Sequence, residues 1–166
     1  SRQPKFAVGD TVVGALGWQD YCVTDGRNLM KVDTRSIPMS AYLGSVGMPG
    51  VTAWYGLNRI CAPKAGETVL VSAASGAVGS VVGQLAKAAG CRAVGIAGGP
   101  DKCGYVTSEL GFDACIDHRE HTDAQSMAGA IRAAAPKGVD GLFENVGGVG
   151  LDGALACMNP FGRVAV

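Results

Sequence analysis

The stretch from Thr68 to Gly79, which reads TVLVSAASGAVG, constrains the fold of this chain more than any other. It opens with residues that favour a β-strand, turns at glycines, and continues into apolar residues at helical spacing. This order is typical of a nucleotide-binding βαβ unit, because the free amides and the dipole of a helix N-terminus attract a pyrophosphate. The pattern is Ala74-x-Gly76-x-x-Gly79, with alanine in place of the first of three expected glycines. It predicts a phosphate-binding turn, and an ordinary tight turn before a buried helix is the alternative.

Strand and helix patterns alternate from this stretch to the end of the chain. A regular alternation predicts an α/β fold with a parallel sheet, right-handed crossovers and helices on both faces, which is the Rossmann-type arrangement. Thr122 and Gln125 have the spacing of a capping box at the start of the third of these helices, which Pro136 to Gly138 end. We expect strands at 68–73, 92–97, 114–117, 139–143 and from Arg163 onward, and helices at 78–89, about 101–110, about 122–135 and near 150–158.

The first part of the chain carries β signals without helices between them. Four short runs are too few to form a core of their own, so we interpret residues 1–45 as the end of a β domain together with a connector. A helix is expected from about Thr52 to Ala62, and residues 46–166 form the nucleotide-binding domain. The chain lacks an initiator Met and stops within a strand, so we expect both ends to be cut within structure. The four expected strands are 6–8, 11–13, 21–23 and 29–32.

The composition excludes several classes of protein. Apolar residues make up 48% and charged residues 17%, and 14 basic residues balance 14 acidic ones. Nucleic acids and anionic membranes require a concentrated basic surface, so we expect neither as a partner. The six cysteines form no CxxC pair, which argues against a zinc knuckle and a disulfide framework. No apolar run reaches membrane-spanning length and the start of the chain lacks the charged and apolar regions of a signal peptide, so a cytoplasmic protein with free thiols is expected.

The end of the second predicted strand distinguishes NADP from NAD. An NAD site usually places a carboxylate there to bind the adenosine ribose, but this strand continues into Gly98 and Gly99. The two glycines leave room and free amides for a phosphate, and Lys102 supplies a positive charge one helical turn later. These features favour NADP as the cofactor, while an ordinary solvated lysine is the alternative for Lys102.

Two further polar residues follow predicted strands. His118 comes directly after the third strand and can reach the same phosphate, although an isolated histidine is more often structural. Asn145 ends the fourth strand, where ligands of open parallel sheets bind, so its amide can meet the nicotinamide half of the cofactor. The alternative for Asn145 is a turn-forming residue before two glycines.

Five ordered motifs together resemble a known family, the zinc-independent medium-chain dehydrogenases/reductases. Within that family the chain is most similar to the group of leukotriene hydroxydehydrogenases, prostaglandin reductases and bacterial curcumin reductases. The resemblance covers nearly the whole chain. The motifs are GMPGVTA at 47–53, AASGAVGS at 73–80, GGxxK at 98–102, LGFD at 110–113 and FENVGG at 143–148.

The resemblance implies a function and a set of cofactor-binding residues. It implies NADPH-dependent reduction of the carbon–carbon double bond of α,β-unsaturated ketones or aldehydes, and a GroES-like β domain ahead of the nucleotide-binding domain. Relatives usually have Tyr where His118 stands, and an imidazole can also donate a hydrogen bond to phosphate. Thr52 matches a position beside the nicotinamide, and helix N-capping is its alternative or additional role. The implied cofactor-binding residues are Thr52, Gly76, Ala77, Val78, Gly79, Gly98, Gly99, Lys102, His118 and Asn145.

The catalytic acid and the metal are less well defined by the sequence. Zinc-dependent relatives place a cysteine ligand where this chain has Met48 and Pro49, so we expect no metal. Hydride attack on the β carbon of an enone requires a donor for the carbonyl oxygen and a proton for the α carbon. Tyr55 is a candidate donor, with a core aromatic as the alternative. A quinone or carbonyl reductase and a non-catalytic NADP-binding module stay open as other functions, and we expect the full-length protein to be a homodimer and this chain alone to be inactive.

Overall fold

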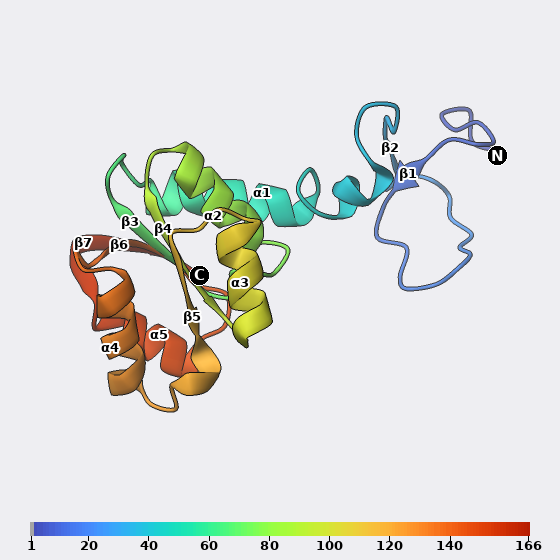
Figure 1. Cartoon of the computed structure of the whole chain (residues 1–166). Helices are drawn as coiled ribbons and strands as arrows, with labels where there is room; N and C mark the ends of the chain where they lie inside the picture. The colour runs from blue at the N-terminus through green and yellow to red at the C-terminus, as the bar shows by residue number, and fades with distance from the viewer. Residues whose placement is uncertain (1) are drawn as a thin grey trace.

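The computed structural model describes residues 2–166 and contains a five-stranded parallel sheet (Figure 1). The strand order is β5-β4-β3-β6-β7, so the chain starts in the middle of the sheet, winds to one edge, and then returns to build the other edge. This doubly wound order confirms the predicted Rossmann-type fold. The strands are β3 (Thr68–Val71), β4 (Arg92–Ala97), β5 (Ala114–Asp117), β6 (Val139–Phe143) and β7 (Met158–Ala165).

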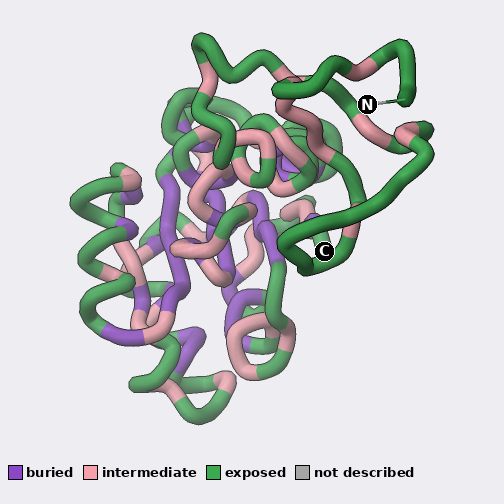
Figure 2. Tube along the Cα trace, turned by 90° about the vertical axis from the view of Figure 1, so that its right-hand side faces the viewer, coloured by how far each residue is buried: buried purple, intermediate pink, exposed green. Residues whose placement is uncertain are grey.

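Helices cover both faces of this sheet. Successive residues of β3 point to opposite faces, so Val69 and Val71 join one buried cluster while Leu70 joins the other. All four residues of β3 are buried, as expected for a central strand of a parallel sheet, and the buried positions in Figure 2 follow the strands. The first cluster lies under α1 (Met48–Tyr55), the π-helix η2 (Gly56–Cys61), α2 (Gly79–Ala88) and α3 (Pro100–Ser108), and the second lies under α4 (Ala124–Ala134) and α5 (Gly148–Leu155).

The predicted strands at 92–97, 114–117 and 139–143 have the bounds seen in the structure. The first predicted strand is too long, because the chain turns after Val71. The last strand begins at Met158 rather than at Arg163, because Met158 already pairs with Val139 of β6. A bulge separates this pair from the next one, between Gly141 and Arg163. As a result α5 starts and ends earlier than the predicted helix near 150–158.

The N-terminus of α4 also differs from the prediction. The helix begins at Ala124, and the side chain of Asp123 accepts a hydrogen bond of 2.8 Å from the backbone amide of Ser126. Asp123 is therefore the N-cap, and the capping box predicted at Thr122 and Gln125 is wrong by one residue. An aspartate suits this place because its charge also interacts favourably with the helix dipole.

The helix predicted from Thr52 to Ala62 begins four residues earlier, at Met48, and its second half is the π-helix η2. Thr52 is therefore inside α1, where its hydroxyl donates to the carbonyl of Met48, so the N-cap role proposed for it is wrong. The predicted apolar face is buried only in part. Ala53, Leu57 and Cys61 are fully buried, whereas Trp54 and Ile60 lie at the margin and are 47% and 42% exposed.

Residues 2–45 contain little regular structure and extend away from the sheet in Figure 1. Their two short strands, β1 (Val12–Val13) and β2 (Met30–Lys31), pair antiparallel, and a 3-10 helix, η1 (Met39–Leu43), follows. The strands predicted at 6–8 and 21–23 are absent, because a strand needs a neighbour for its hydrogen bonds and residues 2–45 offer none there. No residue between 2 and 45 is buried. The division into domains at residue 45 stays a prediction.

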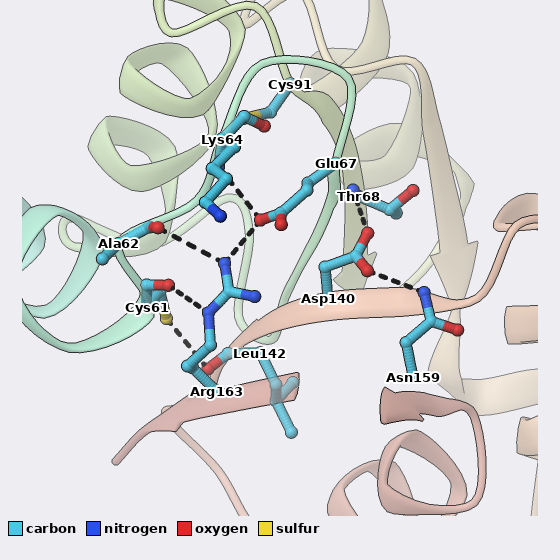
Figure 3. Close-up of polar contacts among 10 residues, drawn as sticks. All are labelled: Cys61, Ala62, Lys64, Glu67, Thr68, Cys91, Asp140, Leu142, Asn159 and Arg163. Carbon is cyan, nitrogen blue, oxygen red and sulfur yellow. Dashed lines mark hydrogen bonds and ion pairs between the residues drawn. The ribbon is translucent and has the colours of Figure 1, made fainter. Parts of the chain in front are cut away.

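Arg163 fastens the edge strand β7 to the connection between η2 and β3 (Figure 3). Its Nε atom donates to the carbonyl of Cys61 at 2.7 Å, and its terminal nitrogen pairs with the carboxylate of Glu67. On the neighbouring strand, Asp140 accepts from the amide of Thr68 at 2.8 Å. These contacts close the end of the sheet opposite the carboxyl ends of the strands, and leave the carboxyl ends open.

None of the helices that the structure describes in residues 2–166 is long and apolar enough to cross a membrane.

Candidate nucleotide-binding site

A cavity of about 600 Å³ lies at the carboxyl ends of the central strands. Residues that follow β3, β4, β5 and β6 line it, together with residues of α4 and α5. Ligands of open parallel sheets bind at this edge. Four residues that the sequence predicted to bind the cofactor line this cavity: Gly76, Gly98, Lys102 and His118.

The turn after β3 brings helix α2 very close to the strand. Ala73 adopts a left-handed conformation, with φ of 48°, and its carbonyl accepts a hydrogen bond of 2.8 Å from the amide of Gly76. A side chain on Gly79 would collide with that same carbonyl, so this position requires glycine. Ala77 and Val78 lie in the turn but do not line the cavity. Their predicted role in holding a pyrophosphate is not tested by these contacts.

Ala74 occupies the place where the fingerprint expects its first glycine, and its methyl group is fully buried. The adjacent strand β4 carries Gly95 beside it. A Cβ atom on Gly95 would stand 2.8 Å from the Cβ of Ala74, which is too close for two carbon atoms. The missing glycine is thus compensated by a glycine on the neighbouring strand.

The turn after β4 is held by the end of β5. The Asp117 carboxylate accepts hydrogen bonds from the amides of Gly99 at 2.8 Å and of Arg119 at 3.0 Å. These backbone hydrogen bonds, that from Gly99 first, hold the pKa of Asp117 below its ordinary value. The His118 ring lies directly against the turn, with Nε2 2.8 Å from the place of a Cβ on Gly98.

Arg119 is a residue of this cavity that the sequence reasoning missed. Its side chain lies over the same turn as His118, with Nη1 3.0 Å from the place of a Cβ on Gly99. The sequence feature that could have predicted this residue is a second basic side chain directly after His118, at the end of a predicted strand. Lys102 is exposed and stands in the first turn of α3, which follows the two glycines. Lys102, His118 and Arg119 thus all line the cavity near this turn.

Glu144 is a second residue that sequence reasoning missed, although it lies within a quoted motif. It is only 4% exposed and lines the cavity. Its Oε1 atom accepts from the Ser72 hydroxyl at 2.8 Å and from the amides of Val146 and Gly147 at 2.6 and 2.8 Å. Its Oε2 atom is buried without a hydrogen-bond partner. The carboxylate thus shapes the turn that leads from β6 into α5.

Asn145 ties the same turn to β3. Its amide donates to the Ser72 hydroxyl at 2.7 Å, and its side-chain nitrogen donates to the Ser72 carbonyl at 2.8 Å. The side chain is exposed but does not line the cavity. These contacts give Asn145 a structural role in the turn, and its predicted role in cofactor binding stays a prediction.

Thr52 and Tyr55, on α1, do not line this cavity. Tyr55 is 57% exposed, so the interpretation of this aromatic as a core residue is wrong. A role for Thr52 beside a nicotinamide, or for Tyr55 as a proton donor, is neither supported nor contradicted by these positions.

A zinc site requires several His, Cys, Asp or Glu side chains close together. Within residues 2–166, no group of three or more His, Cys, Asp or Glu side chains is arranged to hold a metal ion. Met48 opens α1, and the nearby Cys61 is buried and donates to the carbonyl of Leu142. The part of the chain that the structure describes therefore does not provide a zinc ligand set.

Comparison with known families gives a match over more than half of the chain. The family model described as zinc-binding dehydrogenase matches residues 77–166, which include α2, most of the residues that line the cavity, and the last strand. The chain belongs to this family.

Among curated relatives, the chain is 46% identical over 167 residues to 2-alkenal reductase (NADP(+)-dependent) of Nicotiana tabacum, a match that covers 100% of this chain and 48% of that protein. It is also 46% identical to NADPH-dependent curcumin reductase of Escherichia coli (strain K12), covering 100% of this chain and 47% of that protein. The chain thus spans about half the length of the curated relatives it matches.

Solved structures give the same picture. CurA from Vibrio vulnificus in complex with NADPH is 43% identical, with a TM-score of 0.86 over 97% of this chain and 47% of that one. The mycobacterial quinone oxidoreductase is 31% identical, with a TM-score of 0.62 over 74% of this chain and 35% of that one.

Proposed function

We propose that the protein reduces the carbon–carbon double bond of α,β-unsaturated ketones or aldehydes with NADPH. The observation that carries this proposal is the cavity at the carboxyl ends of the strands, where the glycine turn after β3 and the basic side chains around Gly98 face the same space. The similarity to 2-alkenal reductase and to curcumin reductase, both named for NADP dependence, supports the choice of substrate and cofactor.

The residues of the cavity fit a dinucleotide phosphate. A Cβ on Gly76 would stand 3.1 Å from the Ala73 carbonyl, so the turn is kept free of side chains where a pyrophosphate would approach the start of α2. No carboxylate stands at the end of β4, and Lys102 lies in the first turn of the following helix. Lys102, His118 and the Gly98 backbone would hold the ribose phosphate, and the amides beside Gly76 and Gly79 would hold the pyrophosphate.

Hydride delivery to the β carbon of the enone is the chemistry that NADPH would supply. The residues of this chain would bind and orient the adenine end of the cofactor, and the buried Glu144 would fix the turn between β6 and α5 against the cavity. Charge would develop on the carbonyl oxygen, which requires a hydrogen-bond donor. Tyr55 does not line the cavity, and its role as that donor stays a prediction.

A quinone reductase on the same scaffold is the second candidate. The specific observation in its favour is the similarity to the mycobacterial quinone oxidoreductase. The identity to that protein is 31%, against 46% for 2-alkenal reductase, so the enone substrate is the better-supported choice.

Steady-state assays on the full-length protein that contains this chain test the proposal. NADPH consumption should be fast with a linear enone or enal and slow with a quinone or a saturated ketone. With NADPH deuterated at the transferred position, NMR of the product should place the deuterium on the β carbon. Consumption with quinones alone would favour the second candidate, and binding of NADPH without turnover of any of these substrates would favour a non-catalytic binding module. A cytoplasmic location, a homodimer and a GroES-like assignment of residues 1–45 stay predictions.

A further inference from the structure

The guanidinium of Arg119 forms no hydrogen bond or ion pair within residues 2–166, although it borders a cavity. Other arginines of this domain have partners for their side chains. Arg163 pairs with Glu67, and Arg92 donates twice to the carbonyl of Ala134. Five donor hydrogens of Arg119 therefore remain available to a ligand.

Arg119 is exposed, and its side chain lies against the turn after β4. Its backbone amide donates to Asp117, which also accepts from Gly99, so the end of β5 and the turn after β4 are held together. The side chain then runs along the turn, with Nε 3.4 Å and Nη1 3.0 Å from the places that Cβ atoms of Gly98 and Gly99 would occupy. A side chain on Gly99 would press on the guanidinium, whereas one on Gly98 would first meet the His118 ring.

The chemistry around Arg119 selects an anion. Lys102 and His118 line the same cavity, so two further donors face the ligand that Arg119 would meet. The one carboxylate of this turn, Asp117, already accepts two backbone amides through the same oxygen atom. A planar guanidinium can donate to two phosphate oxygens at once, whereas the lysine ammonium acts as a point charge.

We infer that Arg119 is a specificity-determining residue that binds the phosphate monoester on the adenosine ribose of the cofactor. This inference rests on the proposed NADP-dependent function and adds to it a residue that its sequence motifs do not include. Lys102 and His118 approach the phosphate from α3 and from the tip of β5, and Arg119 closes the site over the two glycines. Discrimination between phosphorylated and unphosphorylated nucleotides thus depends on a guanidinium as well as on Lys102.

Calorimetric titration with two probes separates this inference from the proposed function. The probes are 2′,5′-ADP, which carries the ribose phosphate, and 5′-ADP, which lacks it. The wild-type protein should bind 2′,5′-ADP more tightly. In Arg119→Ala, the affinity for 2′,5′-ADP should fall by about 10- to 100-fold, as expected for a lost charge-assisted pair, and the affinity for 5′-ADP should be unchanged. Arg119→Lys should lie between the two, because it keeps the charge and loses the planar fork.

Arg59→Ala is the matched control. Arg59 is exposed, lies over the Trp54 ring at 5.5 Å, and does not line the cavity, so its removal should leave both affinities unchanged. Unchanged binding of 5′-ADP by Arg119→Ala also shows that this variant is folded. If the wild type fails to prefer 2′,5′-ADP, the proposed function is wrong. If the wild type prefers it and Arg119→Ala retains the full preference, or loses affinity for both probes equally in a folded protein, only the inference about Arg119 is overturned.

Discussion

The Ser72 hydroxyl donates a hydrogen bond of 2.8 Å to the buried carboxylate of Glu144, and this contact joins the end of β3 to the end of β6 beneath the cavity. The same oxygen of Glu144 accepts two backbone amides of the following turn. One carboxylate thus holds together two strands and the start of α5.

Replacement of this carboxylate should destabilise the protein. In Glu144→Gln an amide nitrogen replaces one of the two carboxylate oxygens. If it replaces Oε1, it faces the three donors that this oxygen accepts, and if it replaces Oε2, its N–H groups are buried without an acceptor. We expect a loss of about 1–3 kcal/mol in the free energy of unfolding, measured by urea denaturation. Glu109→Gln, at an exposed position at the end of α3, is the control and should change stability by less than about 0.5 kcal/mol. Equal stability of the two variants would show that the Glu144 contacts contribute little.

Lys102 provides a test of cofactor choice. In Lys102→Ala, the dissociation constant for NADPH should rise about tenfold, because a charge-assisted contact to the ribose phosphate is lost, while that for NADH should hardly change. Fluorescence titration of both nucleotides measures this, with Lys137→Ala as a control lysine outside the cavity. Equal weakening of both nucleotides would remove Lys102 from the phosphate site.

Two helical glycines should respond in opposite directions to a methyl group. Gly83 of α2 packs directly against the buried ring of Phe112, and a Cβ there would overlap the ring, so Gly83→Ala should cost about 1–3 kcal/mol or more. Gly129 of α4 has open space around it, so Gly129→Ala should add about 0.5–1 kcal/mol through higher helix propensity. Thermal unfolding of both variants measures the difference, and a stable Gly83→Ala would mean that α2 can move away from Phe112.

The ion pair between Glu67 and Arg163 should make stability depend on pH. The hydrogen bond from Arg163 lowers the pKa of the Glu67 carboxyl below its ordinary value of 4.5. A lowered folded-state pKa means that the stabilisation is complete above pH 4.5 and is lost as the pH falls through the folded-state pKa. Glu67→Gln should therefore be less stable than the wild type by about 1 kcal/mol near neutral pH, with the gap closing in acid. Urea denaturation across this range measures the gap, and a gap that persists in acid would assign it to packing.

The parallel sheet could be predicted from sequence because its strands are short, mostly apolar runs that alternate with helix patterns. The strands 92–97 and 139–143 have the predicted bounds for this reason. The runs at 6–8 and 21–23 have similar local propensity, but a strand forms only where a neighbouring strand supplies hydrogen bonds, and propensity does not report the neighbour. The early start of α1 at Met48 follows from Pro49, which suits the first turn of a helix.

The site was predictable where its residues belong to a local motif. Gly76, Gly98 and Lys102 were found in this way, and they line the cavity. Arg119 and Glu144 were missed because their surroundings come from distant parts of the chain. Glu144 meets Ser72 across 72 positions of sequence, and Arg119 meets a turn formed by the preceding strand. Such relationships exist only after the strands have been placed side by side.

The close approach of Ala74 and Gly95 has a wider meaning for the glycine fingerprint. A fingerprint is usually searched along one strand and its turn, and there the alanine counts as a mismatch. In the folded chain, the methyl group of Ala74, in the turn after β3, would collide with a side chain on Gly95 of β4. The room for this alanine therefore depends on a glycine 21 residues away, outside the motif.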